Sequence, residues 1–199
     1  MKILITGAKG FVGKNLSLTL KNRQHEVFEY DLGTPKNDLI AWIKECDFIV
    51  HLAGINRPLT PEEFYQGNAD FTLELTNLLE QNHCNSPIIF SSSIQADRDN
   101  DYGKSKRLGE DYLREFGKRT KTPVFIFRLS NLFGKWSRPN YNSVVATFCH
   151  NLARDLPIEV SNSEAKVDFV YIDDVVDTFV SFIENPLPKV IDESYIVTP

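Results

Sequence analysis

Tyr102 and Lys106 are the residues whose types and spacing point most directly to chemistry. Residues four apart in a helix lie on one face, so the spacing predicts a phenol close to an ammonium group. A nearby positive charge favours the phenolate and lowers the pKa of a tyrosine from its usual value of about 10. The pair therefore predicts a tyrosine that exchanges a proton with a substrate oxygen.

The position of this pair in the chain matters more than its spacing, because a chain with seven tyrosines gives such pairs easily by chance. The pair opens a predicted helix, and it follows an apolar strand over residues 88–90 that delivers three serines, Ser91 to Ser93. In open α/β sheets, ligands bind outside the carboxyl ends of the strands. A site at that edge of the sheet is therefore predicted.

Three glycines, Gly7, Gly10 and Gly13, connect an apolar strand over residues 3–5 to a helix that continues through Leu20. A helix N-terminus presents unpaired N–H groups, and glycines let a pyrophosphate approach the backbone, so this junction suits anion binding. The first gap is one residue wider than in the commonest dinucleotide fingerprint. A tight turn without a ligand is the alternative, but the order strand, glycines, helix favours a dinucleotide site.

Asp31 ends a second predicted strand, over residues 27–30. A carboxylate there usually accepts hydrogen bonds from the adenosine ribose of NAD, whereas NADP sites tend to place an Arg nearby. Asp31 therefore favours NAD. NADP stays an alternative, since either Lys9 or Lys36 can contact its additional phosphate. It is also an alternative that Asp31 binds no cofactor and is an exposed residue that opens a turn.

The other elements alternate strands and helices, which predicts an α/β fold with one doubly wound parallel sheet, a Rossmann fold of order 3-2-1-4-5-6. Asn68, in a predicted helix over residues 61–80, contacts either the backbone or a ligand. One domain is expected over residues 1–199. Residues of about 132–168 and 185–199 are expected to form a small or truncated C-terminal substrate lobe.

The composition limits the function classes. The net charge of −5 argues against nucleic acid as a partner, because phosphate binding needs clustered Lys and Arg. No apolar run approaches the roughly 20 residues of a membrane helix, and a strand that begins at Lys2 leaves no room for a signal peptide. A cytoplasmic protein is therefore expected. The three cysteines are widely spaced, and no metal site is predicted.

Six motifs in this order resemble the extended short-chain dehydrogenase/reductases, which include nucleotide-sugar epimerases, dehydratases and reductases. The motifs are Gly-Ala-Lys-Gly-Phe-Val-Gly13, His51-Leu-Ala-Gly54, Ser91-Ser-Ser93, Tyr102-x-x-x-Lys106, Arg128-x-x-Asn131-x-x-Gly134 and Asp168-Phe-Val-Tyr-Ile-Asp-Asp174. The resemblance implies that Tyr102 is the catalytic acid, that Lys106 binds the nicotinamide ribose and tunes Tyr102, and that Ser93 orients the substrate carbonyl.

The expected ligand contacts extend along the whole chain. Contacts to NADP or NAD are expected from Gly7, Lys9, Gly10, Phe11, Val12, Gly13, Asp31, Asp38, Leu52, Ala53, Gly54, Asn68, Ser91, Tyr102, Lys106 and Leu129. Contacts to a UDP-sugar substrate are expected from Arg57, Ser92, Gln95, Asn131 and Lys135, with Ser92 as the alternative to Ser93 at the carbonyl.

The segments around Arg57, Gln95 and Lys135 are similar to the N-terminal reductase part of bacterial capsular polysaccharide and O-antigen enzymes that make a UDP-N-acetyl-6-deoxytalose. That group uses NADPH to reduce a 4-keto sugar. The resemblance therefore favours NADP, whereas Asp31 favours NAD. A 4,6-dehydratase needs an acid and a base beside the serine, and Ile94 and Gln95 supply neither.

Three alternatives stay open: a reductase, a 4-epimerase, and a non-catalytic dinucleotide sensor in which the Tyr–Lys pair is a relic. Members of the family usually run well beyond 199 residues. A missing C-terminal domain or partner is therefore expected, and a homodimer is a further expectation.

Overall fold

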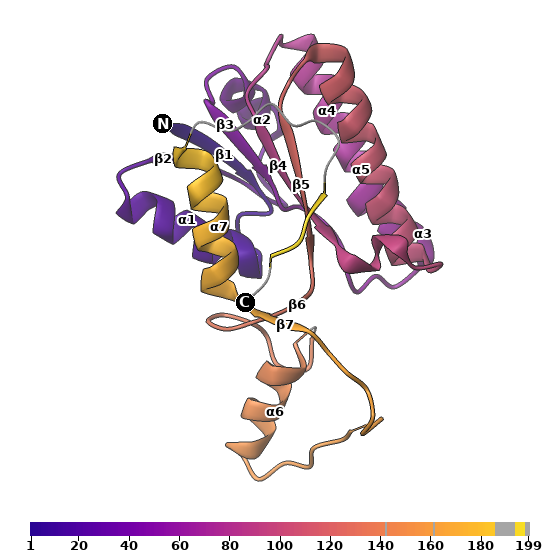
Figure 1. Cartoon of the computed structure of the whole chain (residues 1–199). Helices are drawn as coiled ribbons and strands as arrows, with labels where there is room; N and C mark the ends of the chain where they lie inside the picture. Colours follow the sequence, from indigo (N-terminus) through magenta and orange to yellow (C-terminus); the bar gives the residue numbers. More distant parts are fainter. Residues whose placement is uncertain (142, 161, 186–193, 198–199) are drawn as a thin grey trace.

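The computed structural model describes residues 1–141, 143–160, 162–185 and 194–197. Its centre is a six-stranded sheet in the order β2-β1-β3-β4-β5-β8, in which neighbouring strands are all parallel (Figure 1). The strands are β1 (Lys2–Thr6), β2 (Glu26–Tyr30), β3 (Phe48–His51), β4 (Ile88–Ser93), β5 (Val124–Leu129) and β8 (Ser194–Tyr195).

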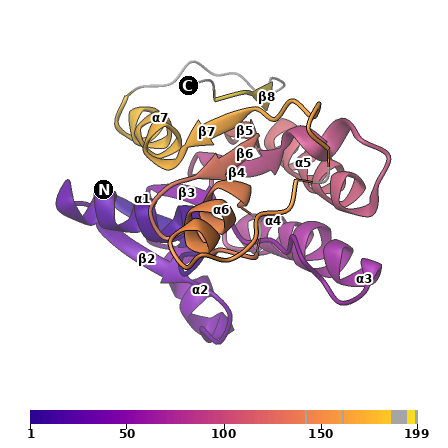
Figure 2. The same ribbon diagram turned by 90° about the horizontal axis from the view of Figure 1, so that it is seen from below.

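Helices cover both faces of the sheet (Figure 2). One face packs against α1 (Phe11–Asn22) and α7 (Ile172–Glu184). The other packs against α2 (Lys36–Ile43), α4 (Phe71–Gln81) and α5 (Asp101–Thr120). The predicted α/β fold with a doubly wound parallel sheet is therefore confirmed.

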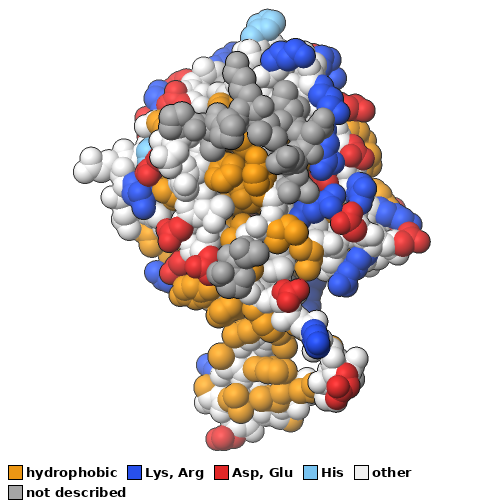
Figure 3. Space-filling view, in the orientation of Figure 1, with side chains coloured by type: hydrophobic (Ala, Val, Ile, Leu, Met, Phe, Trp, Pro, Cys, Tyr) orange, Lys and Arg blue, Asp and Glu red, His pale blue; other side chains and the backbone are white. Residues whose placement is uncertain are grey.

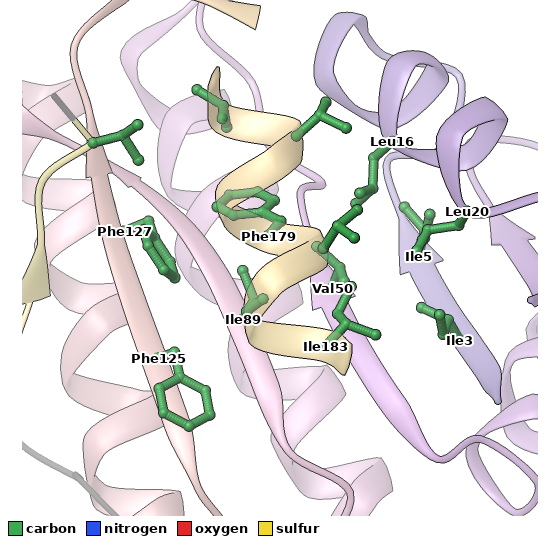
Figure 4. Packing of buried hydrophobic residues seen from close by; sticks show 14 of the residues in the cluster. Ile3, Ile5, Leu16, Leu20, Val50, Ile89, Phe125, Phe127, Phe179 and Ile183 are labelled. Carbon is green, nitrogen blue, oxygen red and sulfur yellow. The ribbon is translucent and has the colours of Figure 1, made fainter. Parts of the chain in front are cut away.

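Successive side chains of each strand enter opposite layers, because strand side chains alternate. Ile3 and Ile5 join the α1/α7 layer, whereas Leu4 joins the other. Figure 4 shows Phe125 and Phe127 of β5 in the first layer, near α7. Strands buried on both faces have nearly continuous apolar sequences, which is why they were readable from the sequence.

The predicted strand order 3-2-1-4-5-6 is wrong. Residues 31–47 contain α2 and no further strand, so β2 is the edge strand among the described residues, and β3 instead pairs with β1 on the side away from β2. The winding direction reverses between β1 and β3. In open sheets such a switch point opens a crevice at the carboxyl ends of the two strands.

A smaller unit extends from the carboxyl edge of the sheet (Figure 1). It contains a two-stranded sheet of β6 (Asn131–Phe133) and β7 (Phe169–Tyr171), and the helix α6 (Val144–Leu152). No residue of α6 is buried, Leu152 is 64% exposed, and apolar side chains occupy much of the visible face of this unit (Figure 3). Of the second expected lobe segment, 185–199, residues 186–193, 198 and 199 lie outside the described residues.

No helix in the described part of the chain is both long enough and apolar enough to cross a membrane.

Candidate functional site

A cavity of about 1160 Å³ lies at the carboxyl ends of β1, β3, β4 and β5. Its lining begins at the glycine turn, passes Lys106, and ends at Trp136 and Tyr141. Ligand pockets usually measure about 300–1,000 Å³, so this cavity has room for a ligand longer than a mononucleotide. It occupies the switch point between β1 and β3.

The glycine turn is closely packed against the backbone around it. Gly7 has a φ of +73°, and a Cβ there would lie 2.7 Å from the backbone nitrogen of Ala53. A Cβ on Gly13 would lie 2.3 Å from the carbonyl oxygen of Gly7. Phe11 begins α1, whose first turn contains no acidic residue, and its first N–H groups have no partners within the helix. The turn therefore offers an anion a close approach to unpaired backbone donors.

Asp31 lies at the edge of the cavity next to this turn. Its Oδ2 accepts a hydrogen bond of 2.6 Å from the backbone N–H of Lys9, and its Oδ1 accepts one of 2.8 Å from Leu32. Asp31 therefore both shapes the turn and presents a carboxylate to the cavity. Lys36 is paired with Glu74, while Lys9 lines the cavity.

Asp38 is placed differently from the expectation. It lies in the first turn of α2, which begins at Lys36 after Pro35, and it is exposed. It does not line the cavity. Because α2 begins at Lys36, directly after Pro35, Asp38 lies on the helix and is exposed rather than facing the cavity.

Two of the expected substrate residues also lie outside the lining. The Arg57 guanidinium stacks 5.6 Å from the ring centre of Tyr141. The Lys135 ammonium lies 4.2 Å from the ring centre of Trp136. Each of these cations is thus held against an aromatic ring that itself lines the cavity.

The structure brings Ser93, Tyr102 and Lys106 together in the cavity wall. Ser93 ends β4, and its Oγ accepts a hydrogen bond of 3.2 Å from the backbone N–H of Gln95, at the start of the 3₁₀ helix η2 (Ile94–Asp97). A Cβ on Gly103 would lie 2.1 Å from the carbonyl oxygen of Gln95. This close approach of η2 and α5 places Tyr102 beside Ser93.

The pKa of Tyr102 is raised by burial, and a hydrogen bond with Ser93 opposes the rise. The expectation of a lowered pKa is therefore wrong for this structure, because the cost of burying a phenolate exceeds the stabilisation by its neighbours. The phenol is neutral at neutral pH. A neutral phenol is the form that can donate a proton.

Lys106 is 5% exposed and shares a helix face with Tyr102. Burial lowers its pKa from 10.5 to about 8, and the Glu110 carboxylate acts in the opposite direction. Its ammonium lies 4.6 Å from the ring centre of Phe90 and 3.6 Å from where a Cβ on Gly54 would stand. A Cβ on Gly54 would lie only 2.6 Å from Oδ1 of Asn68, so the glycine leaves room for the Asn68 amide beside the ammonium.

This lowered pKa predicts that stability increases at alkaline pH. The unfolded chain binds more protons than the folded chain between about pH 8 and 10.5, so the free energy of unfolding rises across that window. A shift of this size corresponds to on the order of 3 kcal/mol. Urea unfolding at about pH 8 and at about pH 10.5 should show a larger increase in the free energy of unfolding for the natural chain than for Lys106→Met. A difference between the two proteins that does not change with pH would contradict the burial of a charged Lys106.

Asn68 contacts protein groups at both ends of its amide. Its Oδ1 accepts a hydrogen bond of 2.8 Å from the N–H of Ile55, and its Nδ2 donates to the Ile55 carbonyl at 2.9 Å and to Ser105 Oγ at 3.0 Å. It belongs to a π-helix, η1 (Tyr65–Asp70), that separates α3 (Pro61–Phe64) from α4. Asn68 therefore fixes the wall beside Gly54 through the backbone, and because it also lines the cavity, its expected cofactor contact stays a prediction.

Ser92 and Ser93 have separate contacts although they are adjacent. The Ser92 hydroxyl donates a hydrogen bond of 2.5 Å to Oε1 of Glu110. It is therefore already engaged, whereas Ser93 bonds to Tyr102. This arrangement favours Ser93 at a substrate carbonyl. The other expected residues in the cavity wall are Lys9, Gly10, Phe11, Val12, Leu52, Ala53, Ser91, Gln95, Leu129 and Asn131.

Some residues of the site were not expected. Tyr30 and Phe71 stack with ring centres 5.9 Å apart, and both line the cavity. Glu110 lies four residues after Lys106, and this spacing was the available signal. A glutamate within a helix usually faces solvent, so its burial could not be read from the sequence.

The described residues fit a dinucleotide. The glycine turn forms a cradle that a Cβ would fill, and the Ser130 hydroxyl in the cavity wall is a buried polar atom without a hydrogen-bond partner among the described residues. Buried polar atoms are usually paired, so Ser130 indicates a place where a bound molecule supplies the missing partner.

Comparisons with known proteins agree with this geometry. Residues 3–197 match the model of the NAD dependent epimerase/dehydratase family. The chain is 50% identical over 192 residues to UDP-2-acetamido-2,6-beta-L-arabino-hexul-4-ose reductase of Pseudomonas aeruginosa, covering 96% of this chain and 52% of the relative. It is 28% identical to dTDP-4-dehydro-6-deoxyglucose reductase of Escherichia coli, covering 92% of this chain and 72% of that protein.

A solved structure is similar along the whole chain. The capsular polysaccharide assembling protein CapF from Staphylococcus aureus superposes with a TM-score of 0.86 at 43% identity, covering 99% of this chain and 53% of that chain. The present chain thus spans about half the length of CapF and of the Pseudomonas reductase.

Proposed function

Because the chain belongs to the NAD dependent epimerase/dehydratase family, we propose that it binds NAD(H) or NADP(H) in the cavity and reduces the 4-keto group of a UDP-linked deoxy-N-acetylhexosamine. The observation that carries the proposal is a neutral Tyr102 hydrogen-bonded to Ser93, with Lys106 on the same helix face. The name of the Pseudomonas reductase supports the UDP-sugar substrate, and the name of CapF, a capsular polysaccharide assembling protein, supports a role in capsule biosynthesis. A role in O-antigen biosynthesis stays a prediction.

The chain's own residues perform the acid chemistry and the positioning. Reduced nicotinamide, when bound, supplies a hydride to the carbonyl carbon. Ser93 donates a hydrogen bond to the carbonyl oxygen, and Tyr102 transfers its phenolic proton to that oxygen as negative charge develops on it. The Lys106 ammonium stabilises the phenolate that remains. The alcohol product thus gains one hydride and one proton.

A 4-epimerase uses the same tyrosine and cofactor, so the stoichiometry separates it from a reductase. Mixing the protein with a UDP-4-keto-6-deoxy-N-acetylhexosamine and reduced cofactor should consume one cofactor per product, and mass spectrometry should show a sugar two hydrogens heavier. Turnover of a UDP-sugar without net cofactor consumption and without a mass change would indicate the epimerase instead.

The choice of cofactor is testable at Asp31. Its carboxylate lines the cavity at the end of β2, the position at which an acidic residue usually favours NAD over NADP, whereas Glu74 in the same lining is neutralised by Lys36. NADH should therefore bind more tightly than NADPH, and Asp31→Ser should reduce that preference by about tenfold, which corresponds to about 1.4 kcal/mol. Fluorescence titration with both cofactors measures this. Tighter binding of NADPH by the natural chain would show that Lys9 outweighs Asp31.

We further propose a cytoplasmic location, where nucleotide sugars and nicotinamide cofactors are available. The homodimer and the C-terminal domain or partner stay predictions. The exposed apolar side chains of α6 support a partner surface on the small unit. Light scattering of the chain in solution measures the oligomeric state.

A further inference from the structure

Glu110 is a fully buried carboxylate that the proposed reaction does not use directly. It lies four residues after Lys106 and eight after Tyr102, so the three side chains form one stripe along α5. A buried charge is costly unless it is paired and hydrogen-bonded. The hydrogen-bond and ion-pair partners of Glu110 therefore show how its buried charge is stabilised.

Both carboxylate oxygens of Glu110 are satisfied by residues of three elements. Oε1 accepts hydrogen bonds from Ser92 Oγ at 2.5 Å and from Arg128 Nε at 2.9 Å. Oε2 accepts from Arg128 Nη2 at 2.8 Å and from Arg114 Nη2 at 3.1 Å. Arg128 also donates from Nη1 to Asp97 Oδ2 at 2.8 Å, which includes η2 in the network.

These contacts connect the backbone segments that carry the reacting side chains. Ser92 precedes Ser93 on β4, Arg128 precedes Leu129 on β5, and Glu110 lies on the helix of Tyr102 and Lys106. A bidentate Arg–carboxylate pair has a defined geometry as well as strength. Glu110 therefore fixes β4 and β5 against α5 directly behind the cavity wall.

Glu110 is also the anion that acts on Lys106. Two further neighbours of Lys106 are uncharged: the Phe90 ring centre lies 4.6 Å from its ammonium, and His51 is neutral because burial lowers its pKa to about 3. Both ring nitrogens of His51 are hydrogen-bonded, to Thr6 at 2.6 Å and to Thr72 at 2.9 Å. Around Glu110 the charged groups are Arg114, Arg128 and, through Arg128, Asp97.

We propose that Glu110 is a positioning residue for the reductase reaction, which holds the Ser93 strand against α5 and acts as the buried counter-charge of Lys106 one helical turn away. This inference rests on the proposed function for its catalytic meaning. Its electrostatic part concerns the folded protein alone. A Glu110 that only stabilised the fold would leave kcat unchanged in a variant that breaks its link to β4 and keeps its charge.

The test is an NMR titration of the chain with ¹³C-labelled lysine, in which the Lys106 signal is assigned by its loss in Lys106→Met. Glu110→Gln keeps the size of the side chain and removes its charge. The Lys106 midpoint should fall by about one pH unit or more, since a unit charge this close acts strongly on a buried group. An unchanged midpoint in folded Glu110→Gln would overturn the proposal.

Asp111→Asn is the matched control. Asp111 is the next residue of α5, its carboxylate also contacts Arg114, and it is 53% exposed. The substitution removes the same charge from the same helix, and solvent screening should leave the Lys106 midpoint unchanged. If Glu110→Gln does not fold, Arg114→Gln replaces it. That change removes a cation from Glu110, so the midpoint should rise, and a fall or no change would overturn the proposal.

The positioning role of Glu110 is tested by measuring reductase activity. Ser92→Ala keeps the Glu110 charge and removes the link to β4, so it should lower kcat without moving the Lys106 midpoint, while unchanged kcat would refute the positional role. In Glu110→Gln the alkaline limb of the kcat/KM profile should move to lower pH together with that midpoint. If the natural chain has no reductase activity, the proposed function fails, whereas the NMR result still tests the electrostatic role.

Discussion

Replacing Tyr102 with Phe is expected to lower kcat by about 10²–10⁴-fold, the usual contribution of a positioned general acid. The aromatic ring and its contact with Phe64, whose ring centre lies 5.5 Å away, are kept by the substitution. The cofactor dissociation constant should therefore remain nearly unchanged. Steady-state kinetics and a fluorescence titration of the variant measure the two quantities separately.

Tyr112→Phe is the control for this variant. Tyr112 lies on the same helix and does not line the cavity, so loss of its hydroxyl should leave kcat at the natural value. Equal turnover by Tyr102→Phe and the natural chain would remove Tyr102 from the mechanism. Loss of cofactor binding in Tyr102→Phe would instead show that its phenol supports the cofactor rather than the proton transfer.

Gly13→Ala is the second change with a large expected effect. Its Cβ would lie 2.3 Å from the Gly7 carbonyl oxygen and 2.8 Å from Ala8 Cα, and backbone atoms cannot turn aside as a flexible side chain does. Overpacking of this kind costs about 1–3 kcal/mol, which lowers the Tm of a domain of this size by roughly 2–12 °C. Because the same turn approaches the pyrophosphate, cofactor affinity should fall by at least about tenfold.

Gly10→Ala provides a graded comparison within the same turn. Its Cβ would lie 3.1 Å from the Gly7 carbonyl oxygen, a contact that a small shift relieves. Its losses of Tm and of cofactor affinity should therefore be smaller than those of Gly13→Ala. If both variants bind cofactor as the natural chain does, the turn is not the pyrophosphate site.

The sequence predicted the layers of the fold better than their order. Apolar runs such as residues 88–90 identify strands buried on both faces, and Gly7, Gly10 and Gly13 identify the first strand-to-helix turn. The order 3-2-1-4-5-6 failed because the short segment 31–47 holds a helix and no strand. Which strands pair depends on the packing of segments that are far apart in the sequence. The local pattern of side chains therefore does not predict the strand order.

The chemistry of the site was predicted where it depends on local spacing. Tyr102 and Lys106 share a helix face by geometry alone. The pKa of Tyr102 was mispredicted, because burial by distant segments raises it. The Glu110 network joins residues 18 positions apart in the chain, from Ser92 to Glu110 and from Glu110 to Arg128. Such contacts become visible only when the sheet brings β4 and β5 together under α5.

The most direct test of the central claim is transfer of deuterium from the nicotinamide to the sugar. The chain is incubated with reduced cofactor deuterated at the transferred position and a UDP-4-keto-6-deoxy-N-acetylhexosamine, and the product is analysed by mass spectrometry and NMR. The proposed function predicts one deuterium at C4 of the product, formed about 10²–10⁴-fold more slowly when Tyr102→Phe replaces the natural chain. Cofactor that binds without transferring deuterium to the sugar would contradict it and would favour the dinucleotide sensor.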